Sequence, residues 1–366
     1  MLEFLTLRPK AFGVDISDLS VKMAQLKPAR DGFKLGAFAQ TALAKGVVRE
    51  GQIQKQDELV AALKKGVQAL RRKGVKTNYI VASLPEQQAF LQIAQLPKMK
   101  KEEVTRAIRF EAENYIPYPL DTMYLDYAII PPFHNHVDHV DVLLASLPKE
   151  AVDPYVAAFE QAGLIPVALE IESLALSRAL MEKQVSPVPV LLIDLGAVGT
   201  NVCIFSGYSL RLTTSLSVSA NKLSNAIQGA LGVSEEKAEE LKLAHGVLDE
   251  GHPVGKQVRD ALSEPLGELA QEIEKYLEYH ESHMPHQHLG VPQKKIKKIM
   301  LCGGGANLRG LPDFLTKELK TEVVVGNPWV NILSSRSREI PELSFADSLR
   351  YTTALGLALR GAQHYD

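Results

Sequence analysis

The chain has 366 residues, of which 46% are hydrophobic and 23% charged, a globular composition in a chain long enough for two or more domains. The formal net charge of -2 gives no electrostatic support for a nucleic-acid partner. No apolar run approaches the ~20 residues needed to span a bilayer, and Cys203 and Cys302 both lie in apolar runs, as expected of buried thiols in a reducing compartment. We therefore expect a cytoplasmic protein that contacts a membrane only through a partner or a surface.

Residues 1–84 predict the first part of a first domain, rich in hairpins. A helix is expected where apolar residues from Val60 to Leu70 recur at spacings of three and four, with lysine and arginine on the opposite face. The expected elements are strands at 12–16, 21–26, 33–38 and 78–83 and a helix at 57–72.

Residues 85–162 predict a small inserted α+β subdomain with the order strand, helix, strand, strand, helix. Pro117 and Pro119 end its first helix. Residues 163–188 are expected to return to the first domain through a helix. The expected elements of the insert are strands at 92–97, 123–130 and 140–146 and helices at 101–115 and 149–162.

Residues 189–366 predict a second domain, which begins with a continuous apolar run typical of a strand buried on both faces. Each domain therefore starts with a strand, an aspartate-bearing turn and a second strand, a pattern that indicates a duplicated α/β architecture. The expected elements are strands at 188–194, 201–205, 210–216, 298–302 and 322–325 and helices at 221–231, 234–245, 255–281, 307–320 and 351–360.

Three glycine- or aspartate-bearing turns are candidate nucleotide contacts: residues 13–22, 194–200 and 302–306. A tight turn between strands exposes backbone N–H groups, and glycine lets phosphate oxygens come close. In the second turn Gly196 and Gly199 give this room, and a hydroxyl donor follows at Thr200. The alternative for such a turn is an ordinary hairpin with an Asx turn.

Aspartate at the end of a strand repels phosphate but suits Mg²⁺, usually through water. Two facing turns would place Asp15 and Asp194 on either side of one metal–phosphate group. Lys22 would return along the second strand and neutralise β- or γ-phosphate oxygens.

The third turn carries Gly303, Gly304 and Gly305 between a buried strand and a helix expected to start near Asn307. Bare backbone there could pack against the flat face of a base or sugar, and the helix N-terminus would favour an anion. The alternative is a flexible connection between strand and helix. Glu239 and Lys242, three residues apart on a helix, could bind a ribose hydroxyl or form a solvated charge pair.

The order and spacing of the three turns resemble the phosphate-1, phosphate-2 and adenosine motifs of the actin-like ATPase fold. Five further segments resemble the PilM family of type IV pilus assembly proteins: residues 96–97, 110–120, 162–166, 170–176 and 354–360. The segment 110–120 is fairly specific.

This resemblance implies a duplicated actin-like (ribonuclease H-like) fold and a cytoplasmic protein, peripheral to the inner membrane, that binds ATP with Mg²⁺. It also implies that the protein binds the N-terminal cytoplasmic peptide of the membrane protein PilN in a groove between the first domain and the insert. The protein would thereby link the inner-membrane alignment complex to the pilus motor ATPases, with self-association as a further property.

The resemblance assigns roles to matching positions. Phosphate and metal contacts fall on Asp15, Ser17, Ser20, Lys22, Asp194, Gly196, Gly199 and Thr200, with the metal held through water by Asp15 and Asp194; ribose contacts fall on Glu239 and Lys242, and adenosine contacts on Gly303, Gly304 and Gly305.

The first turn departs from the Gly-Ser-Ser-Ser usual in that family, because it runs from Ser17 through Asp18 and Leu19 to Ser20. The lost glycine adds a Cβ, and Asp18 adds a negative charge beside phosphate. At ~4 Å and an effective dielectric of ~20, such a contact costs about 4 kcal/mol. We therefore expect weakened ATP binding unless Asp18 turns outward or meets the metal.

Hydrolysis is expected to be weak or absent. Glu172 is the candidate for orienting the attacking water, and the alternative is a carboxylate favoured by the N-terminal end of a helix dipole.

Three other functions stay open: a filament-forming protein of the cell-division FtsA type, a scaffold that binds no nucleotide, and a small-molecule kinase, for which no catalytic aspartate can be named. A histidine cluster (His280, His283, His286 and His288) is a candidate metal site.

Overall fold

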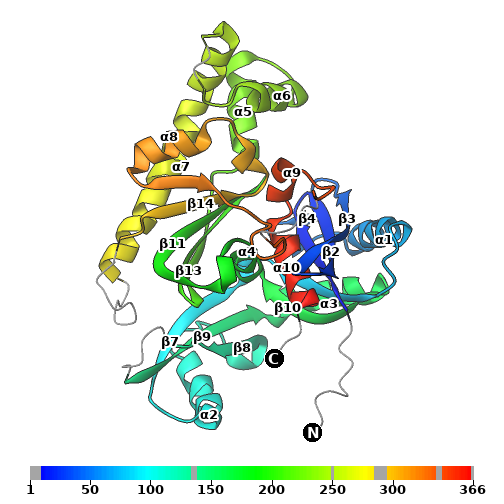
Figure 1. Ribbon diagram of the computed structural model, residues 1–366, viewed down its shortest axis with the longest axis vertical. Helices are drawn as coiled ribbons and strands as arrows, with labels where there is room; N and C mark the ends of the chain where they lie inside the picture. Colours follow the sequence, from blue (N-terminus) through cyan, green and yellow to red (C-terminus); the bar gives the residue numbers. More distant parts are fainter. Residues whose placement is uncertain (1–9, 133–137, 249–250, 284–294, 335–339, 364–366) are drawn as a thin grey trace.

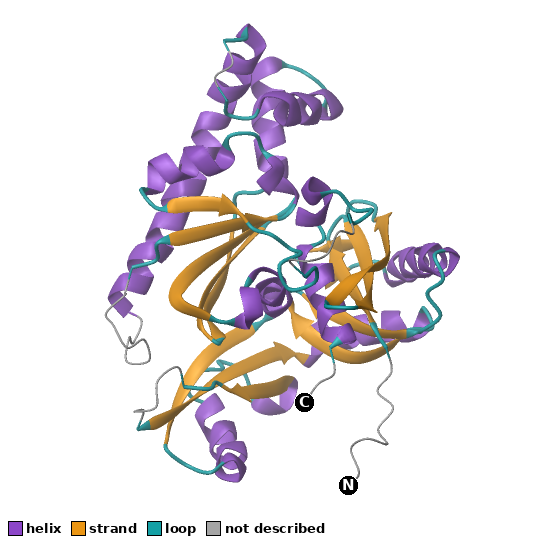
Figure 2. Cartoon of the chain, in the orientation of Figure 1, coloured by secondary structure: helices purple, strands orange, loops and turns teal. Residues whose placement is uncertain are grey.

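Two five-stranded sheets with the same strand order form the two halves of the molecule (Figures 1 and 2). The computed structural model describes residues 10–132, 138–248, 251–283, 295–334 and 340–363. The first sheet has the order β3-β2-β1-β6-β10, and the second has the matching order β13-β12-β11-β14-β15. In both sheets the three hairpin-linked strands are antiparallel and the other two are added in parallel. The expected duplicated α/β fold is confirmed.

The elements of the first half come from both ends of the chain. They are β1 (Phe12–Ser17), β2 (Ser20–Ala29), β3 (Gly32–Ala42), β4 (Val48–Arg49), β5 (Gln52–Ile53), α1 (Gln56–Arg72), β6 (Tyr79–Leu84), α3 (Lys149–Gln161), β10 (Ile165–Ile171), α4 (Glu172–Leu180) and α10 (Thr352–Ala362).

The second half is built from one continuous stretch of chain. Its elements are β11 (Ser186–Leu195), β12 (Thr200–Gly207), β13 (Ser209–Leu216), α5 (Ala220–Leu231), α6 (Glu235–His245), α7 (Pro253–His283), β14 (Lys298–Cys302), α8 (Leu311–Leu319), β15 (Glu322–Val325) and α9 (Phe345–Leu349).

Two helices, α4 and α10, lie between the two sheets (Figure 1). The apolar helix α10 packs against β1, β2 and β6, and Gly13 permits this approach because a Cβ there would collide with the carbonyl oxygen of Ala354. Leu176 and Leu180 of α4 pack instead on the second sheet, beside Leu192. The outer face of the first sheet is covered by α1 and α3. The strands at the centre are therefore buried on both faces, as their apolar runs predict.

The inserted subdomain is a three-stranded antiparallel sheet of order β7-β9-β8 with one helix of its own. Its elements are β7 (Phe90–Pro97), α2 (Lys101–Ala112), β8 (Met123–Ile129) and β9 (His139–Pro148). The following helix, α3, which we expected within the insert, places Tyr155 and Phe159 in the core of the first half. The division at residues 84, 162 and 188 stays a prediction, and the packing of α3 leads us to propose that the insert ends near Pro148.

Strand β10 was missed in the sequence, where only a return helix was expected after the insert. The helix exists as α4, but residues 165–171 before it form an edge strand parallel to β6. Pro166 is tolerated there because an edge strand does not need every N–H group for pairing.

Helix α8 starts later than expected. A short 3-10 turn at Gly304–Asn307 overlaps the glycine run, and α8 begins at Leu311 after Gly310, whose φ of +78° favours glycine. The N-terminus of α8 therefore does not lie at the glycine run.

Across the described part of the chain, no helix combines the length and the apolar composition that a membrane crossing requires.

Candidate functional site

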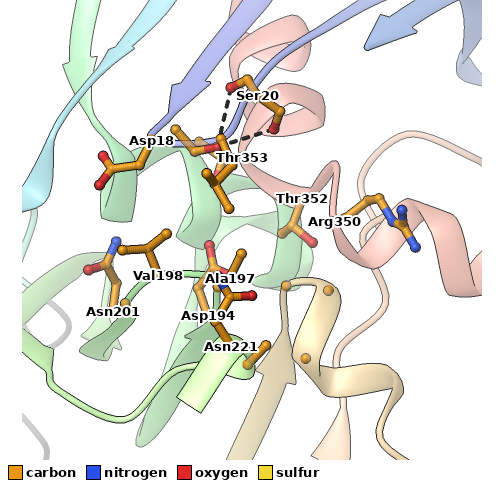
Figure 3. A pocket seen from close by; sticks show the side chains of 18 of the residues that line it. Asp18, Ser20, Asp194, Ala197, Val198, Asn201, Asn221, Arg350, Thr352 and Thr353 are labelled. Carbon is orange, nitrogen blue, oxygen red and sulfur yellow. Dashed lines mark hydrogen bonds between the residues drawn. The ribbon is translucent and has the colours of Figure 1, made fainter. Parts of the chain in front are cut away.

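A cavity of about 770 Å³ between the two halves brings the three sequence turns together. One wall carries the β1–β2 turn, the opposite wall carries the β11–β12 turn, and Gly303–Gly305 lies beside Asp194 (Figure 3). Helix α6 and the first residues of α10 complete the lining. Segments that are far apart in sequence thus form one site.

The first turn places an ion pair in the cavity wall. Asp15 and Lys22 are directly opposite each other in the β1–β2 ladder, and Lys22 Nζ lies 3.4 Å from Asp15 Oδ2. The other carboxylate oxygen accepts a hydrogen bond from Ser83 Oγ at 3.1 Å. The hydroxyls of Ser17 and Ser20 are 3.1 Å apart and also line the cavity.

The second turn is held tightly by its glycines. Gly196 N donates to Gly199 O at 3.0 Å, and a Cβ on Gly196 would stand only 2.7 Å from that oxygen. Asp194 lies at the start of this turn, where burial and the nearby Asp15 carboxylate raise its pKa to about 6. Without a cation, the buried carboxylate is costly to ionise.

The phosphate role assigned to Thr200 is wrong. Its hydroxyl is fully buried and donates to Val218 O at 2.6 Å, so that it fixes the backbone and does not face the cavity. The side chain of Asn201, the next residue along β12, lines the cavity instead. This exchange follows from the alternation of side chains along a strand.

The three consecutive glycines do different things. Gly303 has a φ of +81°, and a Cβ on it would stand 2.6 Å from Leu195 O. A Cβ on Gly305 would be 2.7 Å from Leu195 Cδ2, whereas nothing lies within 4 Å of the corresponding position on Gly304. Gly303 and Gly305 therefore allow close packing on β11, and Gly304 leaves open backbone on the cavity wall.

Glu239 and Lys242 form a pair, but only one of them is accessible. Lys242 Nζ donates to Glu239 Oε2 at 2.6 Å, to Ser224 Oγ at 2.8 Å and to Ala220 O at 3.1 Å, so its three protons are taken up by the protein. The Lys242 ammonium joins α6 to α5. Glu239 remains half-exposed at the cavity, and the Lys242 and Ser224 bonds hold its pKa below the ordinary value despite burial.

Glu172, the first residue of α4, also lines the cavity. Asn201 Nδ2 donates to Glu172 Oε2 at 2.7 Å. Burial, followed by the charges of Asp15, Glu86 and Asp194, raises the pKa of this carboxyl well above its ordinary value. The water-orienting role of Glu172 stays a prediction.

Asp18 turns away from Asp194, toward the tip of the β4–β5 hairpin (Figure 3). Its carboxylate accepts hydrogen bonds from Glu50 N at 2.9 Å and Gly51 N at 3.3 Å. Asp18 still lines the cavity, but two backbone amides of the hairpin tip stabilise its charge.

Several cavity residues were not found in the sequence. Thr352 and Thr353 begin α10, so the N-terminus of α10 reaches the cavity, as Glu172 at the start of α4 does, whereas the N-terminus of α8 does not. No glycine-rich turn precedes them, which is the signal that located the other walls. The remaining missed lining residues include Gln87, Asn221, Asn307 and Arg350.

The other candidates do not gain support. Cys203 and Cys302 are buried free thiols, whose pKa burial raises well above the ordinary value. His286 and His288 lie outside the described residues. Within those residues, no three His, Cys, Asp or Glu side chains converge to hold a metal ion directly.

Comparison with known proteins places this geometry in a family. A protein of the PilM–PilN type IV pilus biogenesis complex is 27% identical, with a TM-score of 0.79 and coverage of 98% of this chain and 100% of that one. Two structures share the fold alone: EutJ from Carboxydothermus hydrogenoformans (15% identity, TM-score 0.58, 97% and 90% coverage) and MreB5 of Spiroplasma citri bound to ADP (13% identity, TM-score 0.53, 94% and 95% coverage).

Among curated proteins, the cell division protein FtsA of Escherichia coli is 25% identical over 230 residues, which is 57% of this chain and 52% of that protein. The chain thus spans about half the length of the curated relatives it matches. The family model for the type IV pilus assembly protein PilM matches residues 13–362. The chain therefore belongs to the PilM family of type IV pilus assembly proteins.

Proposed function

We propose that this protein is a cytoplasmic nucleotide-binding scaffold of type IV pilus assembly. It takes ATP with Mg²⁺ in the cavity between its halves and binds the N-terminal cytoplasmic peptide of a PilN-type inner-membrane protein, linking the membrane alignment complex to the pilus motor. The observation that carries the nucleotide part is the convergence of three separate turns on one cavity of about 770 Å³.

The cavity walls suit different parts of a nucleotide. The backbone of Gly196–Gly199 and the hydroxyls of Ser17 and Ser20 would bind phosphate oxygens, together with Lys22. The open backbone at Gly304 would pack against the base. Glu239 would accept a hydrogen bond from a ribose hydroxyl, while Lys242 keeps α6 in place.

The charge of the cavity fits a metal-bound polyphosphate better than a bare one. Its lining has six carboxylates and three cationic side chains, so a polyphosphate without a cation would be repelled. Asp15 and Asp194 would hold Mg²⁺ through water, and the ion would supply positive charge between the carboxylates and the phosphates. The six carboxylates are Asp15, Asp18, Glu50, Glu172, Asp194 and Glu239, and the cations are Lys22, Lys242 and Arg350.

Binding, not turnover, is the proposed use of the nucleotide. Burial, followed by the charges of neighbouring carboxylates, raises the pKa of Glu172 and disfavours the ionised form that a general base needs. Its Oε2 atom is already bonded to Asn201. Weak or absent hydrolysis is consistent with a protein whose output is partner binding.

The insert is the proposed site of peptide capture, in a groove shared with the first half. The similarity to a protein solved in a PilM–PilN complex, over 98% of this chain, supports a PilN-type partner. A second cavity of about 220 Å³ lies between the insert and the second half, lined by Phe90, Tyr115 and Ile116 of the insert and by Thr213 of β13, and it offers a recess for one peptide side chain.

Calorimetric titration with Mg-ATP, Mg-ADP and a synthetic PilN N-terminal peptide tests the proposal. Asp194→Asn should lose nucleotide affinity and keep peptide affinity, whereas Tyr115→Ala should do the opposite. Absence of nucleotide binding in the wild type, with and without peptide, would leave a scaffold that needs no nucleotide.

A filament-forming role of the FtsA type is the second candidate, because FtsA is 25% identical to this chain over 230 residues. Sedimentation and negative-stain microscopy with Mg-ATP would distinguish the two. Nucleotide-dependent pelleting without peptide would favour the filament.

A further inference from the structure

The tip of the β4–β5 hairpin has an unusual backbone for its sequence. Glu50 and Gly51 form a two-residue loop with φ angles of +49° and +73°. Such loops favour Asn-Gly or Gly-Gly, because the left-handed region is costly for a residue like glutamate. Both residues line the nucleotide cavity. Something outside the hairpin must therefore stabilise the tip.

Asp18 supplies that stabilisation from the β1–β2 turn, the first of the phosphate turns. Its two carboxylate oxygens accept the N–H groups of Glu50 and Gly51, at 2.9 Å and 3.3 Å. Two successive backbone N–H groups that converge on one anion are the kind of arrangement that binds phosphate. Asp18 is thus an internal anion held by a pair of anion-binding amides.

Asp18 lies at the phosphate end of the cavity. Figure 3 shows Asp18 and Val198 on one side of the cavity and Arg350 on the other, and Leu349, the neighbour of Arg350, accepts a hydrogen bond from Gly303 N of the glycine run. A nucleotide with its base at Gly304 would extend its phosphates toward Asp18. The terminal phosphate and the Asp18 carboxylate would then face the same amide pair.

The hairpin tip also contacts both connections to the insert. Tyr155, which is 1% exposed on α3, donates its hydroxyl to Gly51 O at 2.8 Å. On the other side, a Cβ on Gly51 would be 2.8 Å from Pro85 Cγ, so the tip packs closely on the segment that leads to β7. A shift of the tip would therefore displace the two segments through which the chain enters and leaves the insert.

We propose that Asp18 lowers the affinity of the cavity for nucleoside triphosphates relative to diphosphates: the terminal phosphate competes with Asp18 for the Glu50–Gly51 amides, and Tyr155 carries the resulting shift of the tip to α3. This inference rests on the proposed nucleotide binding. It assigns Asp18 as a specificity residue and Tyr155 as a positioning residue.

The test compares Mg-ATP and Mg-ADP on the wild type, Asp18→Ser, Asp18→Asn and Tyr155→Phe. Removing the competing carboxylate should raise the ratio of ATP to ADP affinity by on the order of tenfold in both Asp18 variants. A purely structural role would make Asp18→Asn resemble the wild type, because its amide oxygen still accepts an N–H group. An unchanged ratio in both variants would overturn the inference.

Hydrogen exchange measures whether a shift of the hairpin tip reaches α3 through Tyr155. In the wild type, Mg-ATP but not Mg-ADP should change exchange in residues 48–53 and 149–161. Tyr155→Phe should keep the first change and lose the second. Tyr124→Phe is the matched control, since it removes a hydroxyl bond of 2.9 Å to Asp153 on the same helix, away from the cavity, and should behave as the wild type. Loss of both changes in Tyr124→Phe would contradict the relay.

The outcomes separate the two proposals. If the wild type and Asp18→Ser bind neither nucleotide, the proposed function fails and this inference falls with it. If both nucleotides bind with the same selectivity in all variants, only this inference fails.

Discussion

Asn201 donates its side-chain amide to Glu172 Oε2 at 2.7 Å, and this bond joins β12 of the second half to the first residue of α4 across the cavity. Asn201 Oδ1 in turn accepts a hydrogen bond from Ser215 Oγ at 2.8 Å, which fixes the orientation of the amide. Glu172 is therefore part of a side-chain network that spans the two halves.

Glu172→Gln should change the rate of phosphate release by less than about tenfold, whereas loss of a general base costs ~10²–10⁴-fold. Glutamine keeps an acceptor for Asn201 and is neutral, like the form that the raised pKa favours. Steady-state phosphate release and nucleotide titration are the measurements. A hundredfold loss of rate at unchanged affinity would make Glu172 a catalytic residue.

Asp194 should make the unliganded protein less stable as the pH rises. Its pKa is about 6 in the folded protein against an ordinary 3.8, so the folded state binds the proton more tightly. The resulting stabilisation is complete below about pH 4 and is lost as the pH rises to about 6, with an upper limit of about 3 kcal/mol.

Urea unfolding at several pH values measures this effect. Asp194→Asn should remove that part of the pH dependence, and Asp126→Asn, on the exposed face of β8, should leave it intact. Identical pH profiles for Asp194→Asn and the wild type would contradict the prediction.

Substitutions at Gly303 and Gly304 should have different effects, the first on stability and the second on nucleotide affinity. Gly303→Ala forces a Cβ toward Asp194 and Leu195 at a φ of +81° and should lower the free energy of unfolding by more than about 2 kcal/mol. Gly304→Ala meets no atom within 4 Å and should keep its stability while nucleotide affinity falls. Unfolding curves and titrations of both variants provide the comparison, and equal stability losses would show that the two positions are not distinct.

Substitutions at Lys242 and Glu239 on α6 should likewise affect stability and nucleotide affinity separately. Lys242→Met removes the hydrogen bonds of a buried ammonium and should cost about 1–3 kcal/mol of stability. Glu239→Gln keeps an acceptor for Ser224 and should lose nucleotide affinity with little change in stability. A loss of affinity in Lys242→Met at full stability would restore its assigned contact with ribose.

The duplicated fold could be predicted because its signal is local: a buried strand, an aspartate turn and a second strand occur twice. Asp15 and Asp194 were found for the same reason. Thr200 was misassigned because a shift of one residue along a strand changes the face, and the sequence does not show where the alternation starts. Asn201 occupies the position that Thr200 was given.

Packing between distant segments was not predictable. The apolar stripe of α3 shows that the helix is buried but not against which core, and Tyr155 lies in the first half. The spacing of Glu239 and Lys242 predicts a pair but not that the lysine is buried among α5 atoms. The hydrogen bonds of Asp18 could not be predicted either, because its partners, Glu50 and Gly51, are more than thirty positions away in the sequence.

The position of α10 also governs the order in which the protein can be completed during synthesis. Residues 352–362 cover the inner face of a sheet that begins at Phe12, and Thr352 and Thr353 line the cavity. A nascent chain that still lacks them exposes the apolar surface of β1, β2 and β6 while all three aspartate and glycine turns already exist. The inner face of the first sheet therefore gains its cover only when synthesis has reached residues 352–362.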